Sequence, residues 1–592
     1  MSIFTDIHTT DVGVLDQNSS ATQTSNNSNP LKINSPFTPT NTFDSNIISE
    51  QKYNELYHKV ELYLDNSGTF DAIERNRYHI NPAAVVNLTI ADSFSNWVDE
   101  GSITFMYLPD DVPANHTGGQ RAQTTIKGAK QNAAMLKAYQ FRGDGFDLLK
   151  VKIVPATITN EAKTRTSLNI NPKDPKWMLT FLFSVYDIED IGDVPDIEGL
   201  PSTYMKCFKL YFRDVRYHML KVTNLEYSTA TSKRYSPDFF SGLDNEGVLS
   251  TGDAMLDVYS NALKKFGLGA ELEFGYLSNT NPTWDRGGNS VFYTSPASYS
   301  ALDDLDYLYG QHVGTNFIEG TTINDFCILH TSRNKNPGLF DQLCLTPISE
   351  FFNKAGEETP GELQLEHFFV TSYTSEGENS ASHNYKAPMG TGDDKDLKTS
   401  KYGQILTYSF VDMSPEMNNE LFTTKPVYSV DMSTRTFSVE FANNDVLTAR
   451  KTISDAYISK LKHKGSNLER LFLPTIHSIK KSTSIFPTFT LNGDSKKTRQ
   501  KTGIHQLLYT GLFQNAGICF TTLGLTLRQA GTFIAIDRLG GSQDSDYNNK
   551  LYGQWFVLKV EHAFEGGYYT NRIYAVKTHR YKEMSIKFNQ TI

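Results

Sequence analysis

The segment 553–564, GQWFVLKVEHAF, is the feature that most constrains the fold, because it is apolar on both faces if extended. One face of such a strand carries Trp555, Val557 and Lys559, and the other carries Phe556, Leu558 and Val560. A strand with two apolar faces must be covered on both sides. Gly566 and Gly567 then permit a turn, so the chain from Tyr568 onward can pair back as a long hairpin. Any β-barrel protein could contain this hairpin.

Similar strand patterns, separated by polar and Gly/Pro-rich loops, fill the first and last thirds of the chain. In the first third they lie at 84–90, 102–108, 146–154, 177–188, 206–220 and 222–228. The last third adds 505–513, 517–527, 531–539 and 571–581, and two short strands are expected in the middle at 325–330 and 339–348. Runs of this kind predict largely antiparallel sheets or barrels.

Helical spacing of apolar residues occurs in a few places between these strands. It predicts helices at 50–66, 251–269, 300–313 and 449–464. The helix at 251–269 opens with an aspartate, Asp253, at a plausible N-cap and closes on glycines. The fold class we expect is therefore α+β and dominated by β structure.

The length of 592 residues is too great for one hydrophobic core and predicts several domains. Residues 16–49 are rich in Ser, Asn and Thr and cannot bury enough apolar surface to offset the entropy of ordering. The expected organisation is a flexible arm (1–49), a helical linker (50–80), a first β domain (81–245), a mixed α/β middle domain (246–400) and a second β domain with a helical insertion (401–592).

Charge and cysteine usage exclude several classes of protein. A net charge of −10 argues against a protein that grips nucleic acid through its phosphates, although nucleic acid could slide along such a surface. No apolar run approaches the length of a membrane span, and the amino terminus lacks the pattern of a signal peptide. The scattered cysteines predict reduced thiols in a protein made in a bacterial cytoplasm: Cys207, Cys327, Cys344 and Cys519.

A search for chemistry finds no HExxH, phosphate-binding P-loop, GxSxG or well-placed GxGxxG motif, so we expect neither enzymatic activity nor a cofactor. The weak metal candidate is the acidic segment 187–199, with Asp187, Glu189 and Asp193 as ligands. Ile191 stands where a calcium loop needs an oxygen ligand, which favours a solvated acidic hairpin loop. His562 and His579, at predicted strand ends, are interpreted as hydrogen-bonded structural histidines.

The carboxyl-terminal block resembles the end of phage tail hub proteins, including the late-control family. In these hub proteins a glycine precedes a short strand, and Gly531 stands at that position in this chain. The pattern G-x-W/Y-x-V-x-x-V-x-H-x-F and the turn after it are matched by Gly553, Trp555, Val557, Val560, His562, Phe564, Gly567 and Tyr568. The segment 85–105 is similar to the opening of the first tube domain of such hubs, and 206–228 to its closing strands.

This resemblance implies two tail-tube-like antiparallel β-barrel or sandwich domains with mixed α/β insertions, assembled as a homotrimer. Such a baseplate hub is a non-enzymatic symmetry adaptor of a contractile bacteriophage tail, and it belongs to the virion. It joins the sixfold tail tube to the trimeric central spike, contacts baseplate wedge proteins and leaves a channel for DNA ejection. Alternatives are another wedge or spike-collar protein, a host-binding adhesin and, less favoured because no acid/base pair is visible, a cell-wall hydrolase.

Overall fold

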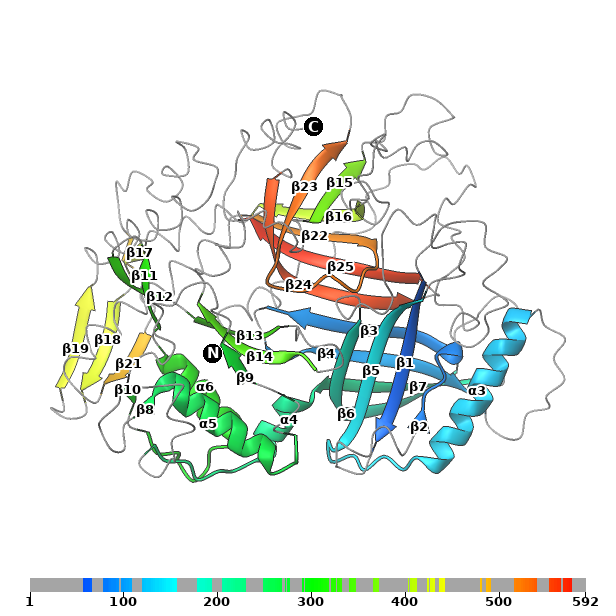
Figure 1. Ribbon diagram of the computed structural model, residues 1–592, viewed down its shortest axis with the longest axis horizontal. Coiled ribbons are helices and arrows are strands. Elements are labelled where there is room, and N and C mark those ends of the chain that lie inside the picture. The colour runs from blue at the N-terminus through cyan, green and yellow to red at the C-terminus, as the bar shows by residue number, and fades with distance from the viewer. Residues whose placement is uncertain are drawn as a thin grey trace.

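The computed structural model describes the chain in segments that are rich in β structure (Figure 1). The described residues are 57–65, 78–94, 97–108, 120–156, 178–193, 205–229, 249–268, 272, 274–276, 290–291, 293–312, 314–318, 321–325, 327–332, 340–347, 366–371, 403, 405–412, 423–424, 426–431, 436–441, 480–481, 486–490, 516–539, 553–565 and 568–577. The predicted arm (1–49), the helix at 449–464, the strand at 505–513 and His579 lie outside them.

One 13-stranded sheet organises the chain. Its main path runs β16 (Ile405–Asp412), β22 (Ala516–Leu523), β25 (Tyr568–Lys577), β24 (Gly553–Glu565), β3 (Val85–Ser93), β4 (Glu100–Tyr107), β7 (Lys206–Asp214), β6 (Leu179–Asp193), β5 (Asp147–Ala156), β1 (Tyr57–Asp65) and β2 (Tyr78–His79). Off this path, β15 (Glu366–Thr371) pairs with β23 (Phe533–Leu539), which pairs with β24. Among the described strands the path stays open, so they form a large sheet and not a closed barrel.

The two ends of the chain meet at the pairing of β24 with β3, where the red strands lie beside the blue one in Figure 1. The strands are antiparallel, and Lys559 stands opposite Ser93 while Glu565 stands opposite Asn87. Two apolar cores lie beneath this sheet, one around Phe105 and Phe183 and the other around Trp555. Strands from the first and last β blocks thus belong to one sheet, and the predicted β-dominated α+β class is confirmed. The boundaries of the predicted domains remain predictions.

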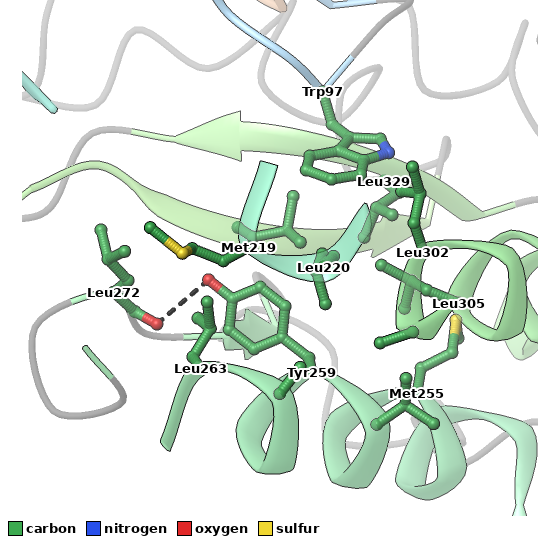
Figure 2. Packing of buried hydrophobic residues seen from close by; sticks show 14 of the residues in the cluster. Trp97, Met219, Leu220, Met255, Tyr259, Leu263, Leu272, Leu302, Leu305 and Leu329 are labelled. Atoms are coloured by element: carbon green, nitrogen blue, oxygen red, sulfur yellow. Dashed lines mark hydrogen bonds between the residues drawn. The ribbon is translucent and has the colours of Figure 1, made fainter. Parts of the chain in front are cut away.

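A helical layer packs against the amino-terminal half of this sheet. It contains α4 (Val215–Val222), α5 (Thr251–Lys264), α6 (Ala301–Gln311) and a small sheet of β13 (Cys327–Ser332), β14 (Gln342–Pro347) and β9 (Phe274–Tyr276). Figure 2 shows its core, in which Tyr259 lies among leucines and methionines and donates a hydrogen bond to the Leu272 carbonyl at 3.1 Å. The predicted helices at 251–269 and 300–313 are confirmed as α5 and α6. The N-cap of α5 is Ser250, and Asp253 lies one turn inside.

A further helix, α3 (Gln120–Ala138), was not expected from the sequence. It packs close to the short turn at Pro82–Ala84 through small residues: a side chain at Gly128 would come within 2.9 Å of Ala83. The buried Asn132 fixes its position, because its Nδ2 donates to the Met106 carbonyl at 3.0 Å and its Oδ1 accepts from Asn81 N at 2.7 Å.

The remaining described elements are short. They are β8 (Leu249–Ser250), β10 (Ser290–Val291), β11 (Gly314–Ile318), β12 (Thr321–Asp325), β17 (Thr423–Thr424), β18 (Pro426–Asp431), β19 (Thr436–Phe441), β20 (Lys480–Lys481), β21 (Phe486–Thr490) and the 3-10 turn η3 (Pro82–Ala84). The main sheet, and not these pieces, positions the surface described next.

Three sequence predictions of local structure are wrong. The expected helix and helical linker after residue 50 instead contain β1, in which Val60, Leu62 and Leu64 are buried at a spacing of two against β5. The expected strand 206–220 ends at Asp214, whose side chain accepts from Arg216 N and so caps helix α4. The expected strand 222–228 forms only an isolated bridge between Ser228 and Thr294.

Candidate functional site: the polar face of the sheet

One face of the main sheet carries polar side chains across eight adjacent strands, from β16 to β6. Cross-strand register sets this face, because directly paired residues point to the same side. Glu561, for example, stands opposite both Arg572 and Ala91, and Ala91 stands opposite Glu100. We call this surface the polar face. It comprises Ser409, Cys519, Thr521, Tyr574, Arg572, Thr570, Lys559, Glu561, Ala563, Glu565, Asn87, Thr89, Ala91, Glu100, Ser102, Thr104, Lys209, Tyr211, Arg213, Asp187 and Glu189.

The other face of the same strands is sealed. Along β24 the burial alternates: Val560, His562 and Phe564 are buried, whereas Lys559, Glu561 and Ala563 between them are partly exposed. The same alternation continues through β25 and β22. This period of two marks a sheet with one face on a core and the other toward water.

A register shift between Val557 and Lys559 corrects the two-faced strand expected from the sequence. The shift is a β-bulge, and the extra residue reverses the phase of the strand beyond it. Val560 therefore packs in the same core as Trp555 and Val557, not on the opposite face. Phe556, on the other side, meets Phe94 at a ring-centroid distance of 4.8 Å, so this end of the strand is covered on both faces as predicted.

The predicted hairpin residues lie together around this strand. Gly531 has a left-handed φ of +79°, and its N–H donates to the Val557 carbonyl at 2.9 Å. This hydrogen bond orients the start of β23 along β24. Gly553 begins β24, and Glu565 pairs with Tyr568 across the connection. Gly566 and Gly567 lie outside the described residues. The assignment of this hairpin as a family motif stays a prediction.

His562 is buried and hydrogen-bonded, and its structural role remains an interpretation. Its Nδ1 lies 2.7 Å from the Tyr569 hydroxyl and 3.0 Å from Asn571 Nδ2. Asn571 Oδ1 accepts from Leu525 N at 2.7 Å and from Arg528 at 2.9 Å. The ring of Phe564 stacks on Tyr569 at 4.2 Å. These contacts hold the hairpin from its sealed side.

The central charges of the polar face come from β24 and β25. Lys559 Nζ lies 2.6 Å from Glu561 Oε1 and 5.3 Å from the centroid of the Tyr574 ring. The second oxygen of Glu561 lies 4.0 Å from Arg572 Nη1. One carboxylate therefore faces two cations, and burial with Glu561 next to it raises the pKa of Tyr574, so that this phenol stays neutral.

A second charged group lies on β7 and β6. Lys209 Nζ lies 4.3 Å from the centroid of the Tyr211 ring, and the Tyr211 hydroxyl donates to Glu189 at 3.0 Å. The Arg213 guanidinium lies 3.8 Å from the centroid of Tyr186, a bulge residue of β6 that is 42% exposed. Cations stacked on aromatic rings in this way are attracted by the ring electrons.

The acidic candidate segment is not a metal loop in its described part. Asp187, Glu189 and Asp193 belong to strand β6, which continues through residue 193. Asp190 accepts from the Tyr107 hydroxyl at 3.0 Å. Nowhere in the described segments do three or more His, Cys, Asp or Glu side chains gather as metal ligands would.

The sequence did not predict that the charged residues of the polar face lie on one surface. Lys559, Glu561 and Arg572 alternate with apolar residues along their strands, and this alternation was a usable signal. Their proximity to Glu189 and Lys209 on one surface depends on the pairing of β24 with β3, which no local pattern reveals.

A buried acidic cluster lies where the sheet meets the helical layer. The Asp99 side chain is almost fully buried, and among the described residues its Oδ1 has no hydrogen-bond partner. Its backbone carbonyl accepts from Asp214 N at 2.7 Å. Burial, followed by the charges of Asp92 and Asp214, raises the pKa of Asp99 well above its usual range, and Arg216 only partly opposes this.

Replacing Asp99 with asparagine should therefore stabilise the protein increasingly as pH rises. A carboxyl with a raised folded pKa contributes stability below its usual value of 3.8, and that contribution is lost as pH rises through the raised pKa. The asparagine side chain has no such titration. The difference in unfolding temperature between Asp99→Asn and wild type should grow as the pH rises above about 4. A difference that does not change with pH would contradict the protonated state of Asp99.

No described helix is long and apolar enough to cross a membrane. No protein-family model and no curated protein matches the sequence. Among solved structures, the chain is similar to the 43 kDa tail protein of prophage MuSo2 from Shewanella oneidensis, with a TM-score of 0.41 and 9% identity over 88% of this chain and 98% of that one. It is also similar to the tail protein from Neisseria meningitidis, with a TM-score of 0.40 and 8% identity over 89% of this chain and 99% of that one. A chain of the half-lidded Francisella PdpA-VgrG complex gives a TM-score of 0.39 and 9% identity over 90% of this chain and 60% of that one. These are likenesses of fold at very low sequence identity.

Proposed function

We propose that this chain is a structural baseplate hub of a contractile phage tail, with no bond-making step of its own. The observation that carries the proposal is the single sheet that passes through both β blocks, sealed on one face and polar on the other. Such a sheet suits the wall of a hollow assembly, because one side needs a packed core and the other needs to face water.

A threefold ring built from such sheets would be wide enough for a duplex. Adjacent strands lie about 4.8 Å apart, so eight strands from each of three copies span a circumference of roughly 115 Å. A ring of that circumference is roughly 37 Å across between facing backbones. This leaves room for a nucleic-acid duplex after side chains are added. The polar face would line the opening.

In this role the homotrimer would join the sixfold tail tube above to the trimeric spike below, because two tube-like β domains per chain, as the resemblance implies, would give six per ring. Wedge proteins would contact its outer side, and DNA would meet it only in transit. The ring would belong to the tail baseplate of the virion after synthesis in the host cytoplasm. The resemblance of the carboxyl-terminal hairpin to tail hub proteins supports this assignment.

The mass and symmetry of the purified protein test the proposal. We expect light scattering to give three copies and negative-stain images to show a threefold ring with a central hole. Particles that are solid in projection, or rings of another symmetry, would contradict it. Lysis of bacterial cell walls in a zymogram would instead favour the hydrolase alternative.

A further inference from the structure

The polar face carries nearly equal numbers of opposite charges. Its cations are Lys209, Arg213, Lys559 and Arg572, and its carboxylates are Asp187, Glu189, Glu100, Glu561 and Glu565. A surface that holds nucleic acid needs cations that are free to replace the counterions of the phosphates.

Each of the four cations is held by another group of the same chain. Lys559 and Arg572 share the carboxylate of Glu561 at 2.6 Å and 4.0 Å. Lys209 lies over Tyr211, whose hydroxyl is bound to Glu189, and Arg213 lies over Tyr186. Glu561 is the centre of this arrangement, since it faces two of the cations and is itself mostly buried, with 17% of its side chain exposed.

We propose that the polar face is a sliding surface for double-stranded nucleic acid, on which pairing with Glu561 and stacking on Tyr211 and Tyr186 keep the cations from binding phosphates. This inference rests on the proposed function, because it requires a duplex to pass along the face. The paired cations remain present, so the surface is close to neutral and not strongly repulsive. A passing duplex would find neither a lasting contact nor a large electrostatic barrier.

A protein partner fits this face less well than a duplex. The centre of a stable protein interface is usually apolar and poor in charge. The middle of the polar face instead consists of Thr89, Ala91 and Ser102 on β3 and β4, flanked on both sides by the charged groups. It has no large apolar side chain to serve as an anchor for a partner.

The test is a gain of DNA binding when Glu561 loses its charge. Glu561→Gln frees Lys559 and Arg572, whereas the matched control Glu565→Gln removes the same charge from the same strand and face without freeing either cation. The probe is a fluorescent duplex of about 30 base pairs, with binding followed by anisotropy at about 50 mM and about 200 mM salt.

We expect Glu561→Gln to bind this duplex on the order of tenfold more tightly than wild type at the lower salt, with a steeper loss of affinity as salt rises. Glu565→Gln should change affinity by less than about threefold. The double variant Lys559→Gln/Glu561→Gln should fall back toward wild type, because one of the freed cations is gone.

Equal affinities of Glu561→Gln and Glu565→Gln would overturn the inference, since net charge and not pairing would then control binding. Tight binding by wild-type protein would overturn it as well. Both outcomes leave the proposed hub intact if images still show threefold rings with a hole. Loss of the ring in wild-type protein would instead count against the proposed function.

Discussion

Trp555→Asp should abolish folding of the chain into soluble protein. Trp555 is fully buried in the core beneath β24, where its neighbours are Phe368, Val557 and Ile573. Removal of a buried Trp side chain costs about 3–5 kcal/mol through lost contacts and the cavity left behind. An aspartate adds a buried charge among the apolar side chains of this core. Together these costs approach the whole stability of an ordinary domain, about 5–15 kcal/mol.

The measurement is the soluble fraction and the circular dichroism of the purified variant. The matched control is Thr521→Asp, which places the same charge on the polar face of β22, directly opposite Arg572. Thr521 is partly exposed, so we expect a change of no more than about 0.5 kcal/mol there. Normal folding of Trp555→Asp would show that the placement of the hairpin is wrong.

Arg216→Leu should destabilise the junction between the sheet and the helical layer by about 3–5 kcal/mol. The Arg216 Nε donates to both oxygens of Asp214, at 2.8 Å and 3.0 Å, and one Nη donates to the Asp341 carbonyl at 2.8 Å. Both side chains of the pair are only 4% exposed. Removal of the cation leaves the Asp214 carboxylate buried without its partner, and that desolvation is the source of the loss.

The free energy of unfolding, from urea denaturation followed by circular dichroism, measures this effect. The double variant Asp214→Asn/Arg216→Leu should recover much of the loss, because no buried charge remains and asparagine can still cap α4. The exposed pair Arg142–Asp144 provides a comparison, since Arg142→Leu should cost no more than about 1 kcal/mol. If the single and double variants lost the same free energy of unfolding, the buried charge of Asp214 would not be the source of the loss.

The sequence predicted many strands of the main sheet because these segments are rich in β-branched and aromatic residues, but it predicted a helix at β1 and no strand at β15 or β16. Residues 84–90, 102–108, 146–154 and 177–188 all fall within observed strands or overlap them closely. Helix α3 was missed for a physical reason. Its packed side consists of the small residues Gly128, Ala129 and Ala133, and small residues leave no strong hydrophobic pattern.

The candidate site was predicted less well than the fold. The sequence singled out the hairpin residues of β24, whose role stays a prediction, but it predicted neither the bulge after Val557 nor the charges of the polar face. A bulge inserts a single residue and has no fixed sequence signature in this strand. At Asp214, by contrast, the signal was present, because an aspartate before a helical turn is a common cap.

The pairing of β24 with β3 has a consequence for the order of events during synthesis. Ala530 N donates to Asp92 at 2.9 Å across a sequence separation of 438 residues. During synthesis, one edge of strand β3 therefore keeps unpaired backbone N–H and C=O groups until β24 has left the ribosome. Such exposed edges can pair with other chains. Contacts so distant in sequence also make folding slow. We expect nascent chains halted before residue 553 to aggregate or to recruit chaperones, even though most of the amino-terminal sheet has already been made.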